Sequence, residues 1–261
     1  MGPPAQPRSD GPARTRLVLV HGSRLGHSQW APQVPLLEEE FDLVLPDLPG
    51  HGSRVGEPFT LDRAVGALAG SIDGPGRGRP PGRVVLVGHS LGGYAAMAYA
   101  ARFPGRLDGL VLVGSAAVPV GLGAAVYRII GSLTERAGPD RMTRVNDRVL
   151  SRLYAPDLIA PVIAGGYFFD PTPAAWREVM TRCRPAMLRH VECPVLVTGG
   201  QYDQLMVQAR RFARAAPSGR VELVPGAGHL VGFDQPVRLA ELLRFFAHSV
   251  QEARDGTMAA P

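Results

Sequence analysis

Runs of consecutive apolar residues alternate with amphipathic stretches through much of the chain. Apolar runs of this kind predict strands that are buried on both faces, as in a parallel sheet. They occur at 16–20, 41–45, 83–87, 108–113, 193–200 and 220–226. Helical periodicity occurs between or after them, at 61–73, 91–103, 207–215 and 236–249. The alternation predicts an α/β fold: a mostly parallel, twisted sheet with helices on both faces.

The segment from about 116 to 190 has a different pattern. It contains no apolar run typical of a buried strand, and three stretches in it have helical periodicity: "AAVYRIIGSLTERAG", "MTRVNDRVLSRLY" and "AAWREVMTRCRPAMLR". A helical insertion of this size between two core strands predicts a cap over one edge of the sheet. The expected organisation is therefore a disordered leader at 1–15, a core formed by 16–115 and 191–250, a helical cap at 116–190 and a flexible tail at 251–261.

A serine stands at the junction between the third predicted strand and the helix that follows it. The residues Gly88-His89-Ser90-Leu91-Gly92 match G-x-S-x-G in the strand–turn–helix context that this motif requires. A serine on so sharp a turn has strained backbone angles, and glycines two positions away allow the turn to close. Backbone N–H groups at the start of the helix then point to where an oxyanion would form. A glycine-rich turn that contains a serine by chance is the alternative, and the context favours a nucleophile.

A nucleophilic serine needs a general base. The chain has seven histidines, and the predicted base is His229, which follows a strand in the glycine-rich "VPGAGHLVGF". The others are less suitable: His190 and His248 lie in helical patterns, His21, His51 and His89 lie in tight turns, and His27 is not assigned a role.

The base in turn needs an acid that orients it. Asp203 lies in the turn after the strand at 193–200 and is the predicted acid. Asp234 precedes Gln235-Pro236 and is expected to cap the last helix. Asp47 lies in a bend where it can bond to its own backbone, and Asp108 begins a strand. The loop after that strand, "GSAAV", contains no carboxylate.

Composition and charge narrow the classes of partner. The chain has 261 residues and a formal net charge of +5, and all 28 basic residues are arginines spread along the sequence. Nucleic-acid-binding proteins usually gather their charge in a patch or stripe, so a nucleic-acid partner is not expected. The two cysteines, Cys183 and Cys193, do not form a C-x-x-C pair, and no two histidines have zinc-binding helical spacing. We therefore expect no metal site.

The N-terminal residues and the hydropathy bear on location. Residues 1–16 lack the apolar region of a secretory signal, and no apolar run is long enough to span a bilayer. A cytoplasmic location is therefore expected. The absence of lysine excludes a side-chain Schiff base and, with the alanine, glycine and proline bias, indicates a GC-rich bacterial genome.

Five segments together carry a family resemblance. In chain order, "LVLVHGS", "PDLPGHGSR", "VGHSLGGYAA", "TGGQYD" and "GAGHL" resemble the α/β-hydrolase superfamily over about 16–250. The resemblance implies an oxyanion hole formed by the backbone N–H groups of Leu91 and Ser23, a cap at 116–190 and no cofactor. Antiparallel strands often precede the first strand of this family, but they are hard to see in residues 1–15, which implies a shortened sheet.

The expected function is that of a serine hydrolase. It would cleave a carboxylic ester, lactone or thioester of a medium-sized lipophilic small molecule through an acyl-enzyme at Ser90. Apolar residues of the cap and of the first loop are candidates for an acyl pocket, although such residues more often pack the cap onto its domain. These candidates are Trp30, Tyr127, Ile130, Leu133, Tyr167, Phe168, Phe169 and Trp176.

Two alternatives stay open at the level of sequence. The same triad serves C–C bond cleavage, cofactor-free peroxidase chemistry and natural-product cyclisation in related folds. A catalytically silent ligand-binding protein is the other, although binding alone would not require an intact Ser90, His229 and Asp203.

Overall fold

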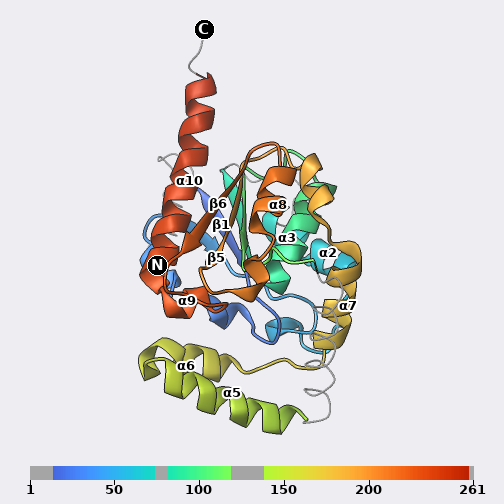
Figure 1. The fold of residues 1–261 in the computed structure, drawn as a ribbon, viewed down its shortest axis with the longest axis vertical. Coiled ribbons are helices and arrows are strands. Elements are labelled where there is room, and N and C mark those ends of the chain that lie inside the picture. The colour runs from blue at the N-terminus through green and yellow to red at the C-terminus, as the bar shows by residue number, and fades with distance from the viewer. Residues whose placement is uncertain (1–13, 74–81, 119–137, 259–261) are drawn as a thin grey trace, which may run out of the picture.

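One parallel sheet organises the molecule (Figure 1). The computed structural model describes residues 14–73, 82–118 and 138–258, with side chains to residue 252. The strands of these residues pair in the order β2-β1-β3-β4-β5-β6, and every pair is parallel. They are β1 (Arg16–Val20), β2 (Asp42–Val44), β3 (Val84–His89), β4 (Gly109–Val113), β5 (Val195–Gly200) and β6 (Gly219–Val224). The predicted α/β fold is confirmed.

Helices cover both faces of the sheet, and successive strand residues pack against opposite layers. Val18 and Leu86 belong to a core cluster with α2 (Leu61–Asp73), α3 (Leu91–Arg102) and α8 (Ala209–Ala215). Their neighbours Leu17 and Val87 belong to a second cluster, with α10 (Pro236–Met258). Both faces of β1, β3, β4 and β5 are buried, and this is why these strands are continuous apolar runs. The strand at 220–226 was also expected to be buried on both faces, but β6 lies at the edge of the sheet and is largely exposed.

The helices predicted in the core have bounds close to those observed, except at the end of the chain. In the inserted segment, the stretch predicted at 174–189 divides into two helices, Thr172–Arg182 and Pro185–His190, and the stretch at 124–138 lies almost entirely outside the described residues. The last helix, expected to end near 249, runs to Met258, so residues 251–258 are helical rather than a flexible tail. The segment "QEARDGTM" consists largely of residues that favour or tolerate a helix, and its single glycine costs about 1 kcal/mol without ending it. Short helices complete the core: η1 (His27–Trp30), α1 (Val34–Leu37), η2 (Gly52–Arg54), η4 (Pro185–His190), η5 (Gln204–Met206) and α9 (Val231–Asp234).

The inserted segment contains helices with two different positions. Figure 1 shows α5 (Pro139–Leu153) and α6 (Pro156–Gly165) together, apart from the sheet and its covering helices. Helix α6, to which the sequence analysis assigned no element, contacts η1, which follows the carboxyl end of β1. In contrast, α7 (Thr172–Arg182) packs on α2 and α3 and buries Ala175 and Val179 in their core cluster. The α5–α6 pair therefore lies on the side of the sheet where the first strand ends.

The helices of the described residues were compared with the requirements of a membrane span. Across the described ranges, the structure contains no helix with the length and apolar character that crossing a membrane requires.

The packing of the central strand predicts the effect of truncating a leucine there. Leu86 is fully buried in β3. We expect Leu86→Ala to lower the free energy of unfolding by about 2–5 kcal/mol, because it removes apolar contacts and leaves a cavity. Leu153→Ala is the matched control, since the Leu153 side chain is 66% exposed, and it should change that free energy by no more than about 0.5 kcal/mol. Urea denaturation measures both, and equal losses would contradict this assignment of the core.

Candidate active site

The carboxyl ends of the parallel strands bring the predicted site residues together. Ser90 directly follows β3, Asp203 lies in the turn after β5, and His229 lies in the loop after β6. Ser23 follows β1, the neighbour of β3. These parallel strands end at one edge of the sheet, so residues far apart in sequence meet there.

Ser90 has an unusual backbone conformation. Its φ is 51° and its ψ is −116°, and its N–H donates to the Val113 carbonyl at 2.8 Å. A non-glycine residue in such a region carries strain of about 1–3 kcal/mol. A Cβ placed on Gly88 would lie 2.3 Å from the Gly92 oxygen, and one on Gly92 would lie 2.5 Å from the His21 oxygen. Neither position has room for a side chain, so the turn requires both glycines.

A continuous line of hydrogen bonds joins the three predicted side chains. Ser90 Oγ lies 3.1 Å from His229 Nε2, and His229 Nδ1 lies 2.9 Å from Asp203 Oδ2. The second Asp203 oxygen, Oδ1, accepts from the Leu205 N–H at 2.8 Å. Burial raises the pKa of Asp203, but hydrogen bonds from His229 and Leu205 outweigh it and hold this pKa below its ordinary value. The ionised carboxylate favours a proton on Nδ1, which leaves the lone pair of Nε2 facing the serine hydroxyl.

The predicted oxyanion donors lie next to Ser90. The Leu91 N–H is the first amide of α3, and a first-turn amide has no acceptor within its helix. The loop that carries Ser23 passes close by, because a Cβ on Gly22 would lie 3.3 Å from Ser90 Cβ. The Gly22 N–H itself donates to Gln29 Oε1 at 2.7 Å, which fixes this loop. The roles of the Leu91 and Ser23 amides stay predictions.

The sequence also matches the model of a known protein family. The model of the "Alpha/beta hydrolase family" matches residues 17–242. The chain belongs to the alpha/beta hydrolase family, and it is an enzyme of that family.

Three relatives are informative. A pimeloyl-[acyl-carrier protein] methyl ester esterase of Neisseria meningitidis is 27% identical over 261 residues, which cover 92% of this chain and 79% of that protein. Lipase LipV of Mycobacterium tuberculosis is 32% identical over 176 residues, 65% of this chain and 53% of the lipase. Among solved structures, a thermophilic esterase of Thermogutta terrifontis superposes with a TM-score of 0.74 at 28% identity, covering 91% of each chain.

A second histidine, His89, lies next to His229. His89 Nε2 donates to the His229 carbonyl at 2.9 Å, and the two rings lie 4.9 Å apart between centroids. Burial, with the neighbouring His229, lowers the pKa of His89 to about 3, so its ring is neutral at ordinary pH. From sequence, His89 was assigned only to a tight turn, and this contact was not predicted. Nothing in the local pattern distinguishes it from any other turn histidine.

Asp47 fastens the loops after β1 and β2 to each other. Its carboxylate accepts from the backbone N–H groups of His27 and Ser53, both at 2.8 Å, and from the Ser53 hydroxyl at 2.9 Å. Burial raises the pKa of Asp47, but these hydrogen bonds outweigh it and lower the pKa below its ordinary value. In the same region His21 Nε2 accepts from the Leu48 N–H at 3.0 Å. Asp47 therefore holds the loop that carries Ser23 rather than facing His229.

Asp234 does not have the position expected of a helix cap. It accepts from the Gly228 N–H at 2.7 Å and from the Tyr154 hydroxyl at 2.6 Å. The expectation failed because the Asp234 side chain turns toward the loop of His229 instead of the first turn of α10. It thereby links the end of α5 to that loop.

The candidate pocket residues divide into groups. Trp30 is 1% exposed within the second core cluster, whereas Trp176 is half-buried against the first. A role for either tryptophan in the acyl pocket stays a prediction. Tyr127, Ile130 and Leu133 lie outside the described residues.

The remaining candidates form a segment that lies against the loop of Ser23. The Phe168 N–H donates to the Arg24 carbonyl at 2.8 Å, and the Arg24 guanidinium carbon lies 5.8 Å from the centre of the Phe169 ring. Tyr167 stacks on Phe169, and its hydroxyl donates to Asp147 at 2.8 Å. The structure thus places this aromatic segment against the loop of Ser23.

The described residues include no group of three or more histidine, cysteine, aspartate or glutamate side chains arranged to hold a metal ion.

Asp47 gives a stability prediction with a defined pH dependence. Because its folded-state pKa lies below the ordinary value of 3.8, its stabilising contribution is fully present above about pH 4 and is lost as the pH falls through the folded pKa. We expect Asp47→Asn to lower the free energy of unfolding by about 1–3 kcal/mol at pH 7, because the amide cannot accept all the same bonds. The difference from wild type should shrink at the lowest pH at which both fold. Urea denaturation across pH tests this, and a difference that grows toward low pH would contradict it.

Proposed function

We propose that this alpha/beta hydrolase is a serine hydrolase that cleaves a carboxylic ester, lactone or thioester of a medium-sized lipophilic substrate. The observation that carries the proposal is the line of hydrogen bonds from Ser90 Oγ through His229 to Asp203. A serine hydroxyl becomes a useful nucleophile when a neighbouring base can take its proton in the transition state. The strained backbone of Ser90 is a second supporting observation, because strain of this kind is typical of functional sites.

The geometry supports a two-step acyl transfer. Ser90 Oγ attacks the substrate carbonyl carbon, His229 Nε2 takes the hydroxyl proton, and Asp203 stabilises the imidazolium. The backbone N–H groups of Leu91 and Ser23 donate to the developing oxyanion, and losing one such donor typically costs about 10²–10³ in rate. His229 then protonates the alkoxide or thiolate that leaves. In the second step water attacks the acyl-enzyme, gives its proton to His229, and releases the carboxylic acid as Ser90 regains its proton.

The preference for a lipophilic acyl group rests on the residues beside the loop of Ser23. Phe168 and Phe169 lie there, and the α5–α6 pair lies on the same side of the sheet. Aromatic and aliphatic linings with few polar groups are typical of small-molecule sites. We propose that α5 and α6 act as a cap over the site. The printed names of the relatives, an esterase acting on a methyl ester, a lipase and a second esterase, also support cleavage of carboxylic esters.

Covalent labelling tests the nucleophile without knowledge of the natural substrate. A fluorophosphonate should add once to the wild-type protein, measured as intact mass, because it reacts with an activated serine. We expect no adduct on Ser90→Ala or His229→Ala. A folded wild-type protein that stays unlabelled by a small fluorophosphonate, or labelling that survives in Ser90→Ala, would contradict the proposal.

Asp203 and Asp234 form a matched pair for testing the acid. Both carboxylates accept hydrogen bonds near His229, but only Asp203 contacts its ring. Asp203→Asn should lower kcat by about 10³–10⁴, because the amide no longer favours the productive imidazole tautomer. Asp234→Asn removes no contact to the ring and should lower kcat by less than about tenfold. Hydrolysis of p-nitrophenyl esters from acetate to octanoate measures both effects and the acyl preference. A larger loss in Asp234→Asn would reassign the acid.

A further inference from the structure

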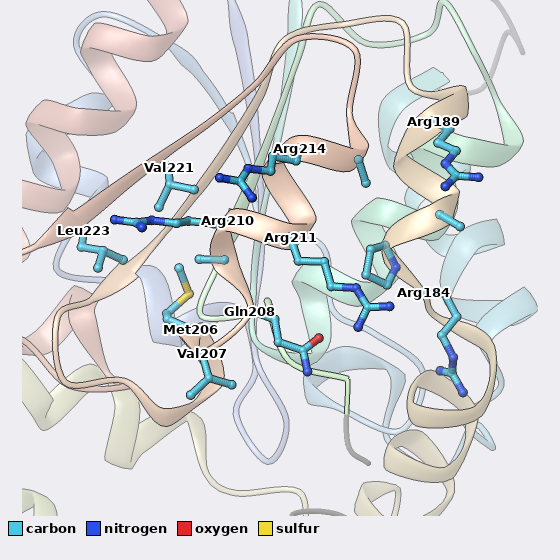
Figure 2. A pocket seen from close by; sticks show the side chains of 14 residues that line it. Arg184, Arg189, Met206, Val207, Gln208, Arg210, Arg211, Arg214, Val221 and Leu223 are labelled. Atoms are coloured by element: carbon cyan, nitrogen blue, oxygen red, sulfur yellow. The ribbon is translucent and has the colours of Figure 1, made fainter.

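A second concave site lies on the outer side of the molecule, between α8, η4 and the edge strand β6 (Figure 2). Its volume is about 740 Å³, which is in the range of small-molecule sites. Neither Ser90, Asp203 nor His229 lines it. Guanidinium groups dominate its lining: Arg184, Arg189, Arg210, Arg211 and Arg214.

Among the described residues, none of these five arginines forms an ion pair with a carboxylate. Elsewhere in the fold, Arg182 pairs with Asp62 and Glu178, whereas no carboxylate is among the residues that line the groove. Within the described part of the chain, Arg210 and Arg214 form no ion pair, and they stand at i and i+4 on α8, where like charges repel. The groove therefore concentrates positive charge that a bound anion would neutralise.

The floor of the groove is apolar. Met206 and Ala209 are buried, and Val221 and Leu223 of the edge strand complete the floor, with Leu223 42% exposed. Figure 2 shows Arg210 and Arg214 beside these two strand residues, and Arg184 and Arg189 on the other side of the groove. A ligand that fits this lining has both a strongly anionic part and an apolar part.

We propose that this groove binds a nucleoside diphosphate, in which a ribose joins a diphosphate to a flat aromatic base whose faces can lie on an apolar surface. Guanidinium groups bind phosphate oxygens through two parallel hydrogen bonds, and these charge-assisted bonds are stronger than neutral ones. A diphosphate places several negative charges within a few ångströms, so it can meet several of these arginines within 740 Å³. A carboxylate ligand needs a larger carbon frame to carry the same charge. The apolar floor then contacts the ring.

The floor of the groove is continuous with the turn that carries Asp203. Met206 belongs to η5, which begins directly after Asp203, and it lies against β5, because a Cβ on Gly199 would be 2.9 Å from its side chain. The ligand thus binds behind this turn, outside the site of Ser90. Binding should therefore be equally strong in Ser90→Ala, and the inference does not rest on the proposed hydrolysis.

Isothermal titration calorimetry of the full-length protein with ADP and with pyrophosphate tests the proposal. We expect ADP to bind more tightly than pyrophosphate, because only ADP has a ring for the apolar floor. The double variant Arg210→Gln/Arg214→Gln should weaken ADP binding at least about tenfold, equivalent to about 1.4 kcal/mol. Both side chains are exposed, so the variant should fold, and thermal unfolding checks this.

The matched control removes the same charge elsewhere. Arg141 and Arg148 are exposed on α5, outside the groove, and Arg141→Gln/Arg148→Gln should change ADP binding by less than about twofold. Equal weakening by both double variants would show attraction by net charge alone and would overturn the site. Three further results would overturn the proposal: no binding of ADP at millimolar concentration, pyrophosphate binding as tightly as ADP, or binding to phosphatidylglycerol vesicles without binding to ADP.

Discussion

The close approach of backbones around Ser90 is the constraint on which the rest of the site depends. The backbones of β1, β3 and α3 approach so closely here that Gly88 and Gly92 have no space for a Cβ: one on Gly88 would meet the start of α3, and one on Gly92 would meet the end of β1. The serine between them has a φ of 51°. This turn aims the hydroxyl out of the sheet edge toward His229. It also places the first amide of α3 beside the same hydroxyl. A looser turn would lose both features together, because one backbone path sets them.

Around this turn, burial keeps one histidine neutral, whereas hydrogen bonds keep two carboxylates ionised. His89 is buried and neutral, and it supports the backbone of His229 from below. Hydrogen bonds lower the pKa of both carboxylates against the effect of burial: those from the backbone N–H groups of Ser53 and His27 for Asp47, and that from His229 above all for Asp203. Only one of the two carboxylates contacts His229, and the other fastens loops. The predicted base therefore contacts one carboxylate, and the neighbouring ring of His89 adds no positive charge.

The sheet and the three principal residues could be predicted from sequence because each has a local signature. Strands buried on both faces are continuous apolar runs, and Ser90 stands in a glycine pattern that few other turns require. Contacts between distant loops have no such signature. The hydrogen bonds of Asp47 to His27 and of Asp234 to Tyr154 join residues that only the folded chain brings together. Trp30 was a candidate for the acyl pocket, and it lies in a core cluster, because a large apolar side chain suits either place.

The same limit applies to charge. The arginines are spread along the sequence, so no patch was predicted, but the packing of α8 against η4 gathers residues from 184 to 214 in one groove.

The left-handed backbone of Ser90 has an evolutionary consequence. Glycine adopts that conformation without strain, so stability alone would favour glycine at position 90. On the proposed function, selection for the hydroxyl keeps a serine there, and a lineage released from that selection should lose the residue early while keeping the fold.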